Sequence, residues 1–216
     1  MLLSPPGVYR AEGDTQLLIG VMREGGHALD RDVLDIGTGS GALAVAAARS
    51  GAATVTAVDL SRRSAAAAWV NSRLNGAAVR VHRGDLFAPV LGRRFGLVVS
   101  NPPYVPAETD ALPRHRKARC WDAGCDGRAV VDRICAEVGE VLAPDGTLLL
   151  VHSGLCDTPA TLAALRSAGL TPEVLARSAV PFGPVMRARA GMLLRRGLIG
   201  AGQVLEELVV VGARHA

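Results

Sequence analysis

The sequence contains few aromatic residues and a single lysine. Only 3% of its 216 residues are Phe, Tyr or Trp, although 49% are hydrophobic. We therefore expect an interior of Ala, Val and Leu, with helices packed closely on a sheet. Lys117 is the only lysine, so arginine supplies almost all of the positive charge behind the net +4. A genome-wide preference for Arg and Ala explains this charge more simply than a phosphate-binding surface, which is the alternative.

Zinc-finger motifs and long apolar runs are absent as well. The four cysteines form no C-x-x-C pair, and no histidine stands at zinc-finger spacing. Cys120 and Cys125 are close enough in sequence to pair, but reduced thiols are the favoured state. No window approaches the ~18 apolar residues of a membrane helix, and the first residues lack the pattern of a signal peptide. We expect a soluble cytoplasmic protein with no metal site and no membrane partner.

The sequence does contain a regular alternation of short apolar segments and amphipathic ones, and its length suits one α/β domain. Strands are expected at residues 33–36, 54–59, 79–82, 95–100, 147–151, 173–180 and 207–211. Helices are expected at residues 15–24, 41–49, 61–74, 128–142 and 158–168. Asp14 or Thr15 is the expected N-cap of the first helix, and Ser61 caps the third.

This alternation predicts a single doubly wound α/β domain, with a seven-stranded, mostly parallel sheet and helices on both faces. Residues 1–30 are expected to form an N-terminal cap segment and residues 31–216 one globular unit. Residues 184–203 are expected to be an insertion between the sixth and seventh strands. The short third strand is expected at an edge of the sheet.

Asn101-Pro102-Pro103-Tyr104 follows the apolar run 95–100 and is the most informative stretch of the chain. Two consecutive prolines fix φ and lack N–H groups, so the carbonyls beside them are free to accept hydrogen bonds. An asparagine side chain, a bare carbonyl and an aromatic ring at the end of a strand could form a slot for a planar NH2 group. The alternative for Asn101 is an ordinary Asn-Pro turn, and for Tyr104 it is plain packing.

A glycine-rich loop, Asp35-Ile36-Gly37-Thr38-Gly39-Ser40-Gly41, leaves the first strand and enters a helix. Its glycines allow the backbone to approach a ligand closely, and the following helix N-terminus offers free N–H groups. Asp59 and Leu60 stand at the end of the second strand, where a carboxylate can accept both hydroxyls of a ribose. A dehydrogenase would match these two features nearly as well, and a tight structural turn would match the loop alone.

Gly84-Asp85-Leu86 follows the third strand. An aspartate at this position can accept the amine of an adenine, while Leu86 offers an apolar edge and a backbone N–H. Taken alone, the segment is more simply a Gly-Asp turn at the surface. Its value lies in its place after the glycine loop and Asp59.

Taken in order, these four segments resemble class I S-adenosylmethionine-dependent methyltransferases, and within them the HemK-type amino-methyltransferases. The resemblance implies a Rossmann-like methyltransferase domain and S-adenosyl-L-methionine as the cofactor. It implies that the glycine loop faces the methionine part, that Asp59 holds the ribose and that Asp85 holds the adenine. Cofactor contacts are implied for Thr15, Asp35, Gly37, Thr38, Gly39, Gly41, Asp59, Leu60, Asp85, Leu86 and Asn101. The implied catalytic residues, which bind the nitrogen to be methylated, are Asn101, Pro102 and Tyr104.

Further segments look like the short branch of this family that methylates the glutamine of release factors. Val8-Tyr9 and residues 12–15 are similar to its N-terminal signature, in which the Asp-Thr pair borders the cofactor, and residues 121–133 are also similar to it. The chain departs from the branch at Gly13, where an acid is usual, and in the length of residues 184–203. Eukaryotic and archaeal members work with a small zinc-binding activator subunit, so the resemblance implies such a partner.

We therefore predict an S-adenosylmethionine-dependent N-methyltransferase acting on a protein glutamine side chain, with a translation release factor as the favoured substrate. The sequence leaves open an RNA methyltransferase acting on adenine N6 or guanine N2, or methylation of a small-molecule amine. A cofactor-binding scaffold without activity is disfavoured by the intact slot. The basic run at residues 114–119 is expected to be a solvated loop or a docking element, and His152 a buried structural residue.

Overall fold

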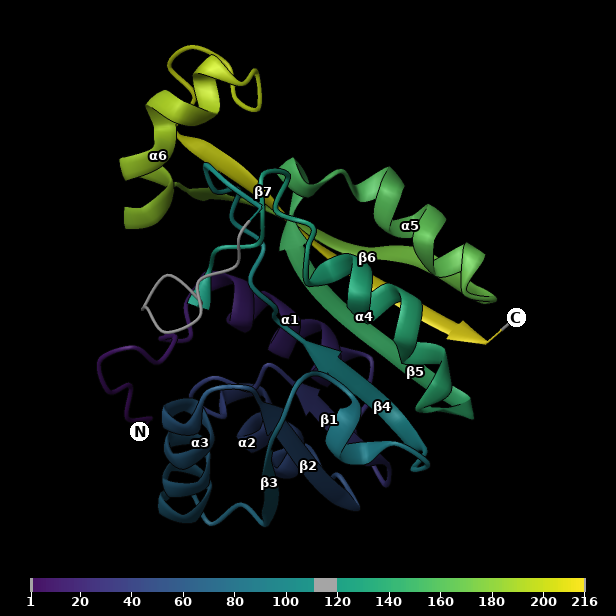
Figure 1. The fold of residues 1–216 in the computed structure, drawn as a ribbon. Helices are drawn as coiled ribbons and strands as arrows, with labels where there is room; N and C mark the ends of the chain where they lie inside the picture. The colour runs from purple at the N-terminus through teal and green to yellow at the C-terminus, as the bar shows by residue number, and fades with distance from the viewer. Residues whose placement is uncertain (1, 111–119, 216) are drawn as a thin grey trace.

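The computed structural model describes residues 2–110 and 120–215, and the seven strands in this part of the chain form one sheet (Figure 1). The strand order is β3-β2-β1-β4-β5-β7-β6. The strands are β1 (Asp32–Ile36), β2 (Thr54–Asp59), β3 (Val79–Arg83), β4 (Phe95–Ser100), β5 (Leu142–Ser153), β6 (Leu170–Pro181) and β7 (Leu205–His215). The strands β1 to β5 pair in parallel, whereas β7 is antiparallel to both β5 and β6. The predicted α/β fold is confirmed, with β3 at an edge.

Helices cover both faces of this sheet. They are α1 (Gly13–Glu24), α2 (Ala42–Arg49), α3 (Arg62–Leu74), α4 (Val131–Glu137), α5 (Thr158–Ser167) and α6 (Pro184–Arg195). Leu18 of α1 and Leu43 of α2 pack in the core of one face. Ile134 of α4 and Leu165 of α5 pack in the core of the other. Because side chains alternate along each strand, the central strands are apolar on both sides, which explains their continuous hydrophobic runs.

The start of β5 lies five residues before the predicted strand. The expected helix over 128–142 is shorter, because α4 ends at Glu137 and a 3-10 turn follows it. Phe95 donates its N–H to the Val141 carbonyl at 2.8 Å, and Phe95 then pairs with Leu142. The register shifts before the next pair, so the Pro-Asp-Gly segment at residues 144–146 bulges within the strand instead of preceding it.

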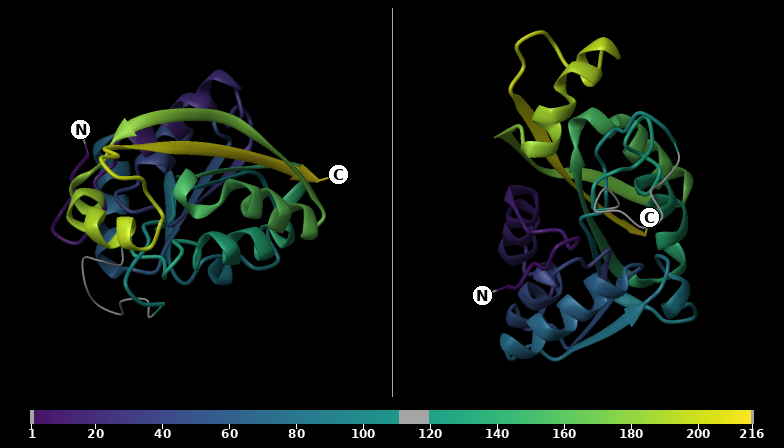
Figure 2. Two further views of the ribbon diagram at one scale, coloured as in Figure 1. Left: turned by 90° about the horizontal axis from the view of Figure 1, so that it is seen from above. Right: turned by 60° about the vertical axis from the view of Figure 1, so that its left-hand side comes forward.

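Two further features of the helices differ from the prediction. The N-cap of α1 is Glu12, without a side-chain hydrogen bond, so the prediction of Asp14 or Thr15 was wrong. Both of those side chains are buried and bonded to other groups. The second difference is α6, a helix that the sequence pattern did not predict and that projects beyond the sheet between β6 and β7 (Figure 2).

Two observations bear on the composition. No helix in the described ranges is both apolar enough and long enough to cross a membrane. Cys120, Cys125, Cys135 and Cys156 all lie within the described residues and form no disulfide, so the pairing of the first two does not occur. The basic run at residues 114–119 falls outside the described residues.

Candidate functional site

A cleft of about 1430 Å³ opens at the carboxyl ends of the parallel strands. This is where ligands bind in open α/β sheets, because the loops after neighbouring strands converge there. Most of the predicted site residues line the cleft: Thr15, Gly37, Thr38, Gly39, Asp59, Leu60, Asp85, Leu86, Asn101, Pro102 and Tyr104. Asp35 and Gly41 are not among the lining residues. The structure thus brings together four segments that are far apart in sequence.

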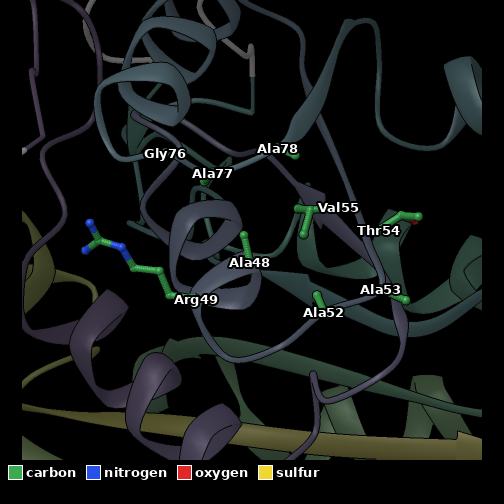
Figure 3. Close-up of a pocket in the computed structure, with 9 residues that line it drawn as sticks. All are labelled: Ala48, Arg49, Ala52, Ala53, Thr54, Val55, Gly76, Ala77 and Ala78. Carbon is green, nitrogen blue, oxygen red and sulfur yellow. The ribbon is translucent and has the colours of Figure 1, made fainter.

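A second, much smaller pocket of about 160 Å³ lies elsewhere (Figure 3). It is lined by residues at the amino ends of β2 and β3, including Ala53, Thr54 and Ala78. Five of its nine lining residues are alanine, and its one charged side chain, Arg49, extends away from the other labelled residues (Figure 3). Neither its size nor its chemistry suits a substrate, so the large cleft is the candidate site.

The glycine loop adopts a conformation that requires glycine. Gly37 and Gly39 have φ values of 71° and 57°. A Cβ on Gly37 would meet nothing within 4 Å, so the loop backbone there is open to a ligand. Gly41, with φ 83°, has a different role, since a Cβ at this position would lie 3.0 Å from the Cα of Ala68 in α3. It allows α2 and α3 to pack closely behind the loop.

Asp35 lies beneath this loop and holds it in place. Its Oδ2 accepts hydrogen bonds from the Thr38 hydroxyl at 2.5 Å and from the Ala44 N–H at 3.0 Å. The side chain is fully buried, and Oδ1 has no partner. Burial raises the pKa of Asp35 from 3.8 to about 7, although both hydrogen bonds oppose the shift. Through these hydrogen bonds, Asp35 supports the glycine loop.

This raised pKa predicts a pH dependence of stability. Between pH 4 and 7 the folded protein holds a proton on Asp35 that the unfolded chain releases. The free energy of unfolding should therefore decrease as the pH rises through this window, by at most about 4 kcal/mol. Asp35→Asn should flatten the dependence measured by urea unfolding at each pH. Asp32→Asn, at the exposed start of the same strand, is the control, and parallel curves for Asp35→Asn and the wild type would contradict the prediction.

Asp59 joins the glycine loop to the start of α3. Its Oδ2 accepts a hydrogen bond from the Gly39 N–H at 2.9 Å, and its Oδ1 accepts one from the Ser61 N–H at 2.8 Å. A carboxylate oxygen can accept more than one hydrogen bond, so a carboxylate at this position can also accept from a ligand hydroxyl. The adjacent Leu60 is 43% exposed. The arrangement presents a fixed carboxylate beside an accessible apolar side chain.

Asp85 forms an ion pair that the sequence did not indicate. Arg133 of α4 donates to both carboxylate oxygens, at 2.9 Å to Oδ2 and 3.2 Å to Oδ1. The hydrogen bond with Asp85 raises the pKa of Arg133. Both side chains are about half exposed and line the cleft. The next residue, Leu86, has a φ of 41°, which is rare for a residue with a Cβ and marks a tightly constrained turn.

Asn101 is oriented by a hydrogen bond from α1. Its Nδ2 donates to the Thr15 hydroxyl oxygen at 3.0 Å, and the Thr15 hydroxyl is within 3.3 Å of Asp14 Oδ1 as its own acceptor. Because Nδ2 donates to Thr15, the carbonyl oxygen of the same amide, Oδ1, is the atom that can accept a hydrogen bond from a ligand. The segment is also fixed from below, because the Ser100 hydroxyl donates to the Ile36 carbonyl at 2.8 Å.

Asp14 is the centre of this network, and it was not among the predicted site residues. Its Oδ2 accepts hydrogen bonds from the hydroxyls of Tyr9, at 2.7 Å, and Tyr104, at 2.8 Å. Burial raises the pKa of both tyrosines, and the negative charge of Asp14 raises it further. Both hydroxyls therefore remain protonated donors. The only sequence signal for this arrangement was the similarity of residues 8–15 to a family signature.

The predicted role of Tyr104 in packing against a substrate is modified by these contacts. Its hydroxyl is committed to Asp14, and its carbonyl accepts a hydrogen bond from the Cys156 thiol at 3.0 Å. Gly127 lies against the same carbonyl, because a Cβ at that position would be 2.4 Å from the Tyr104 oxygen. The ring is thereby held as a wall of the cleft.

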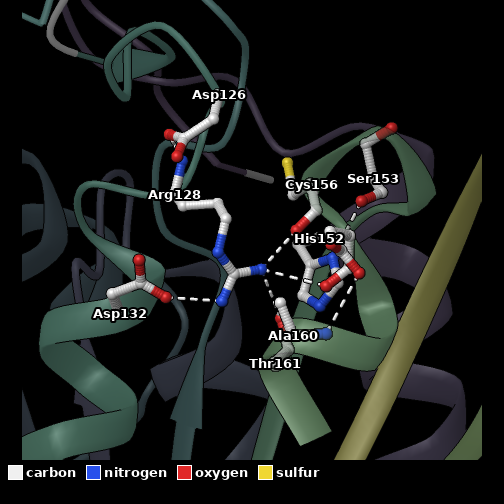
Figure 4. Close-up of polar contacts among 9 residues, drawn as sticks. Asp126, Arg128, Asp132, His152, Ser153, Cys156, Ala160 and Thr161 are labelled. Atoms are coloured by element: carbon white, nitrogen blue, oxygen red, sulfur yellow. Dashed lines mark hydrogen bonds and ion pairs between the residues drawn. The ribbon is translucent and has the colours of Figure 1, made fainter. Parts of the chain in front are cut away.

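A buried arginine supports this wall from behind (Figure 4). Arg128 donates to the carbonyls of Cys156 and Asp157 and to the Thr161 hydroxyl, and it pairs with Asp132. It therefore joins the start of α4 to the turn before α5. His152, drawn beside it, is fully buried, and burial lowers its pKa. Both residues lie outside the lining of the cleft.

The α6 excursion closes the other side of the cleft. Its residues Phe182, Met186 and Leu193 form a small apolar cluster with Val105, just after the Asn-Pro-Pro-Tyr segment. Arg189 donates to the Pro106 carbonyl at 2.8 Å and pairs with Asp122, and Arg196 donates to the Ala107 carbonyl at 2.9 Å. Residues 183–186 line the cleft. Two of the arginines in this segment thus fasten it to the loop that follows Tyr104.

Comparison with known proteins identifies relatives of this chain. Residues 1–115 match the family model of the methyltransferase small domain. A protein of Methanocaldococcus jannaschii, provisionally named a protein N5-glutamine methyltransferase, is 31% identical over 188 residues, 87% of this chain and 93% of its own length. The ribosomal protein uL3 glutamine methyltransferase of Bradyrhizobium diazoefficiens is 47% identical over 124 residues, 54% of this chain. The release factor glutamine methyltransferase of Deinococcus radiodurans is 42% identical over 147 residues, 66% of this chain.

The matches cover only 39% and 52% of the Bradyrhizobium and Deinococcus proteins. Among solved structures, the E. cuniculi Mtq2–Trm112 complex, which methylates the termination factor eRF1, matches with a TM-score of 0.68 and 22% identity. The match covers 97% of this chain and 99% of that one, and at this identity it shows the fold alone. The family model and the Methanocaldococcus relative show more than the fold: the chain belongs to the methyltransferase small domain family.

Proposed function

We propose that this protein is an S-adenosylmethionine-dependent N-methyltransferase that methylates the side-chain amide of a glutamine in a protein of the translation apparatus. The observation that carries the proposal is the hydrogen bond from Asn101 Nδ2 to the Thr15 hydroxyl, which leaves Oδ1 as one acceptor; the carbonyl of Pro102, the next residue along the cleft, is proposed as the second. Two acceptors side by side match the two N–H bonds of a carboxamide. The names of the relatives from three organisms support glutamine as the target.

The residues at the other end of the cleft fit the cofactor. The open backbone of Gly37 can approach a ligand, Asp59 offers a fixed carboxylate to a ribose, and Leu60 offers an apolar surface. S-adenosylmethionine supplies an electrophilic methyl group on a sulfonium centre when bound. Asp85, paired with Arg133, is placed to receive an amine of the adenine with one of its remaining lone pairs.

The contribution of the protein's own residues to catalysis is to orient the substrate amide. A carboxamide nitrogen is a weak nucleophile because its lone pair is delocalised into the carbonyl. Asn101 Oδ1 and the Pro102 carbonyl would accept its two N–H bonds and so orient the nitrogen toward the bound methyl donor, which can contribute about 7–11 kcal/mol. The same two acceptors would stabilise the positive charge that develops on the nitrogen. The surplus proton leaves the nitrogen after transfer.

A translation factor is favoured over RNA as the substrate. Two of the three relatives carry a named protein substrate, a release factor and ribosomal protein uL3. Arginines that might have formed a basic surface are instead bonded internally, as Arg128 and Arg189 are. A substrate of this kind implies that the enzyme works in the cytoplasm. We propose a release factor first, with uL3 as the second candidate.

A small activator subunit is also proposed, at the open edge of β3. Within the described part of the chain this strand pairs on one side only, with β2, and three of its five residues are exposed. An exposed parallel edge can be extended by the strand of another protein. The solved structure of similar fold is a complex with Trm112. Co-purification with a Trm112-like protein, lost on replacing Arg80 with proline, would support this partner.

The proposed function is tested by methyl transfer from tritiated S-adenosylmethionine to a purified release factor and to uL3. We expect label on a glutamine of one of these proteins, identified by mass spectrometry as a gain of one methyl group. Cell extract treated with RNase or with protease distinguishes the alternatives. Label that is lost with RNase and retained after protease would overturn the protein substrate in favour of RNA.

The cofactor half of the cleft gives a separate prediction. Asp59→Ala removes the expected ribose acceptor and frees the Gly39 N–H, so the affinity for S-adenosylhomocysteine should fall by about 100-fold or more, corresponding to two hydrogen bonds to a charged group. Isothermal titration calorimetry measures this change. Asp30→Ala, in the turn before β1, is the control and should bind as the wild type does. An unchanged affinity in Asp59→Ala would place the ribose elsewhere.

A further inference from the structure

Glu206 is a buried carboxylate at the substrate end of the cleft to which the mechanism gives no role. It is the second residue of β7, is 7% exposed and lines the cleft. Its Oε2 is inaccessible to solvent and has no hydrogen-bond partner. Burial raises the pKa of Glu206, while a hydrogen bond with Ser153 opposes the rise. One oxygen of the carboxylate is thus removed from water without gaining a hydrogen-bond donor from the protein.

The surroundings of Glu206 place it beside the predicted acceptor slot. Its charge raises the pKa of Tyr104 and of Cys156, the two residues that meet at the Tyr104 carbonyl. The charge of Asp14 in turn raises the pKa of Glu206. Glu206 also pairs in register with Val180 of β6, and a Cβ on Gly13, the residue before Asp14, would lie 4.0 Å from the Val180 side chain. Glu206 therefore lies at the end of the cleft that contains Asp14 and the Asn-Pro-Pro-Tyr segment.

Several other side chains at this end are bonded to one another. The hydroxyls of Tyr9 and Tyr104 donate to Asp14, and the Thr15 hydroxyl links Asp14 to Asn101. Leaving a buried carboxylate oxygen unpaired costs free energy. An unpaired polar group in a ligand-binding cleft indicates that a bound ligand supplies the missing hydrogen-bond donor.

We propose that Glu206 is a substrate-binding residue, whose carboxylate turns toward the cleft on binding and accepts a hydrogen bond from a main-chain N–H of the peptide segment that carries the target glutamine; this inference rests on the proposed function. The donor is a main-chain N–H because Asn101 Oδ1 and the Pro102 carbonyl already take both N–H bonds of the side-chain amide. A carboxylate oxygen without a proton can only accept, so a donor is the partner that fits it. Glu206 thereby distinguishes a glutamine within a peptide from a free amide.

The test compares Glu206→Leu and Glu206→Gln with the wild type, using the purified release factor as the substrate. Glu206→Leu removes the acceptor, so we expect KM for the release factor to rise at least tenfold, with kcat changed less than KM. Glu206→Gln keeps one side-chain oxygen as an acceptor and should fall between Leu and the wild type. The affinity for S-adenosylhomocysteine should stay within about twofold, since the cofactor end is untouched.

Thermal unfolding separates this role from a structural one. Replacing a buried, partly unpaired carboxylate with an apolar side chain is often neutral or stabilising, so Glu206→Leu should not lower Tm. The matched control is Glu207→Gln, on the opposite face of β7, where the side chain is exposed and paired with Arg177. Its KM should equal that of the wild type.

Each outcome of these measurements either supports or overturns the inference. An unchanged KM in Glu206→Leu, or a rise in KM accompanied by a lower Tm and weakened cofactor binding, would overturn the inference while leaving the proposed function in place. Failure of the proposed function looks different: the wild type itself would methylate neither the release factor nor uL3, and the inference would fall with it.

Discussion

Asn101→Ala is expected to lower kcat for methyl transfer by about 10²–10³-fold, the size of effect seen when one preorganised hydrogen-bonding group is removed from an active site. The reason is geometric. The Thr15 hydroxyl accepts from Nδ2 of Asn101 at 3.0 Å, so the protein itself fixes which end of the amide is presented to the substrate. Without that oxygen the carboxamide has one acceptor instead of two and can rotate out of line with the methyl carbon. The measurement is steady-state kinetics with the labelled cofactor.

The controls for Asn101→Ala separate orientation from binding. The affinity for S-adenosylhomocysteine should change by no more than a few fold, because the ribose and adenine contacts are intact. Asn75→Ala, at the end of α3 and outside the cleft lining, should behave as the wild type. A raised KM with unchanged kcat would mean that Asn101 binds ground state and transition state equally, which contradicts the proposed role.

Gly127→Ala is expected to lower the free energy of unfolding by about 2–5 kcal/mol, for two reasons that add. Its φ of 76° costs about 1–2 kcal/mol for a residue with a Cβ. The new Cβ would also lie 2.4 Å from the Tyr104 carbonyl oxygen and 2.9 Å from the Cys156 sulfur, and overpacking of this kind costs about 1–3 kcal/mol. Urea unfolding measures the change. Relief of the clash should displace the Tyr104 carbonyl and lower activity as well.

Gly197→Ala is the matched control for this prediction. Gly197, after α6, has a similar φ of 68°, but a Cβ there would meet nothing within 4 Å. It should therefore show the conformational cost alone. Equal destabilisation by the two substitutions would show that the contact with Tyr104 carries no energy, and the seating of the Asn-Pro-Pro-Tyr segment would need another explanation.

Most of the fold could be predicted because its central strands are continuous apolar runs bounded by glycine, proline or aspartate. The predictions failed where a tertiary contact overrode the local signal. Phe95 draws Val141 and Leu142 into the sheet, so a segment with a helical pattern becomes the start of β5. The arginines and small residues of α6 show only a weak apolar face, because Met186 and Leu193 are the helix's only buried residues.

The features of the site also divide into those that could be predicted from the sequence and those that could not. The glycine loop, Asp59 and Asn101 could be placed together because the ends of parallel strands meet at one edge of a sheet. The methyltransferase family that they predicted is confirmed by the family model, while the individual residue roles stay predictions. The contact between Asp14 and Tyr104 spans 90 residues, and that between Arg189 and Asp122 spans 67. No local pattern encodes such pairs, so neither was predicted.

The position of β7 in the sheet has a consequence for how this protein is made on the ribosome. β7 lies between β5 and β6, so β6 emerges from the ribosome earlier yet has no neighbouring strand until residues 205–215 follow. Until then β5 keeps an open apolar edge, the kind of surface that chaperones bind and that aggregates. The glycine loop and Asp59 can be folded by that time, whereas Glu206 arrives with β7. The cofactor end of the cleft is therefore expected to form during synthesis, and the substrate end to be completed only after the nascent chain has been extended through β7.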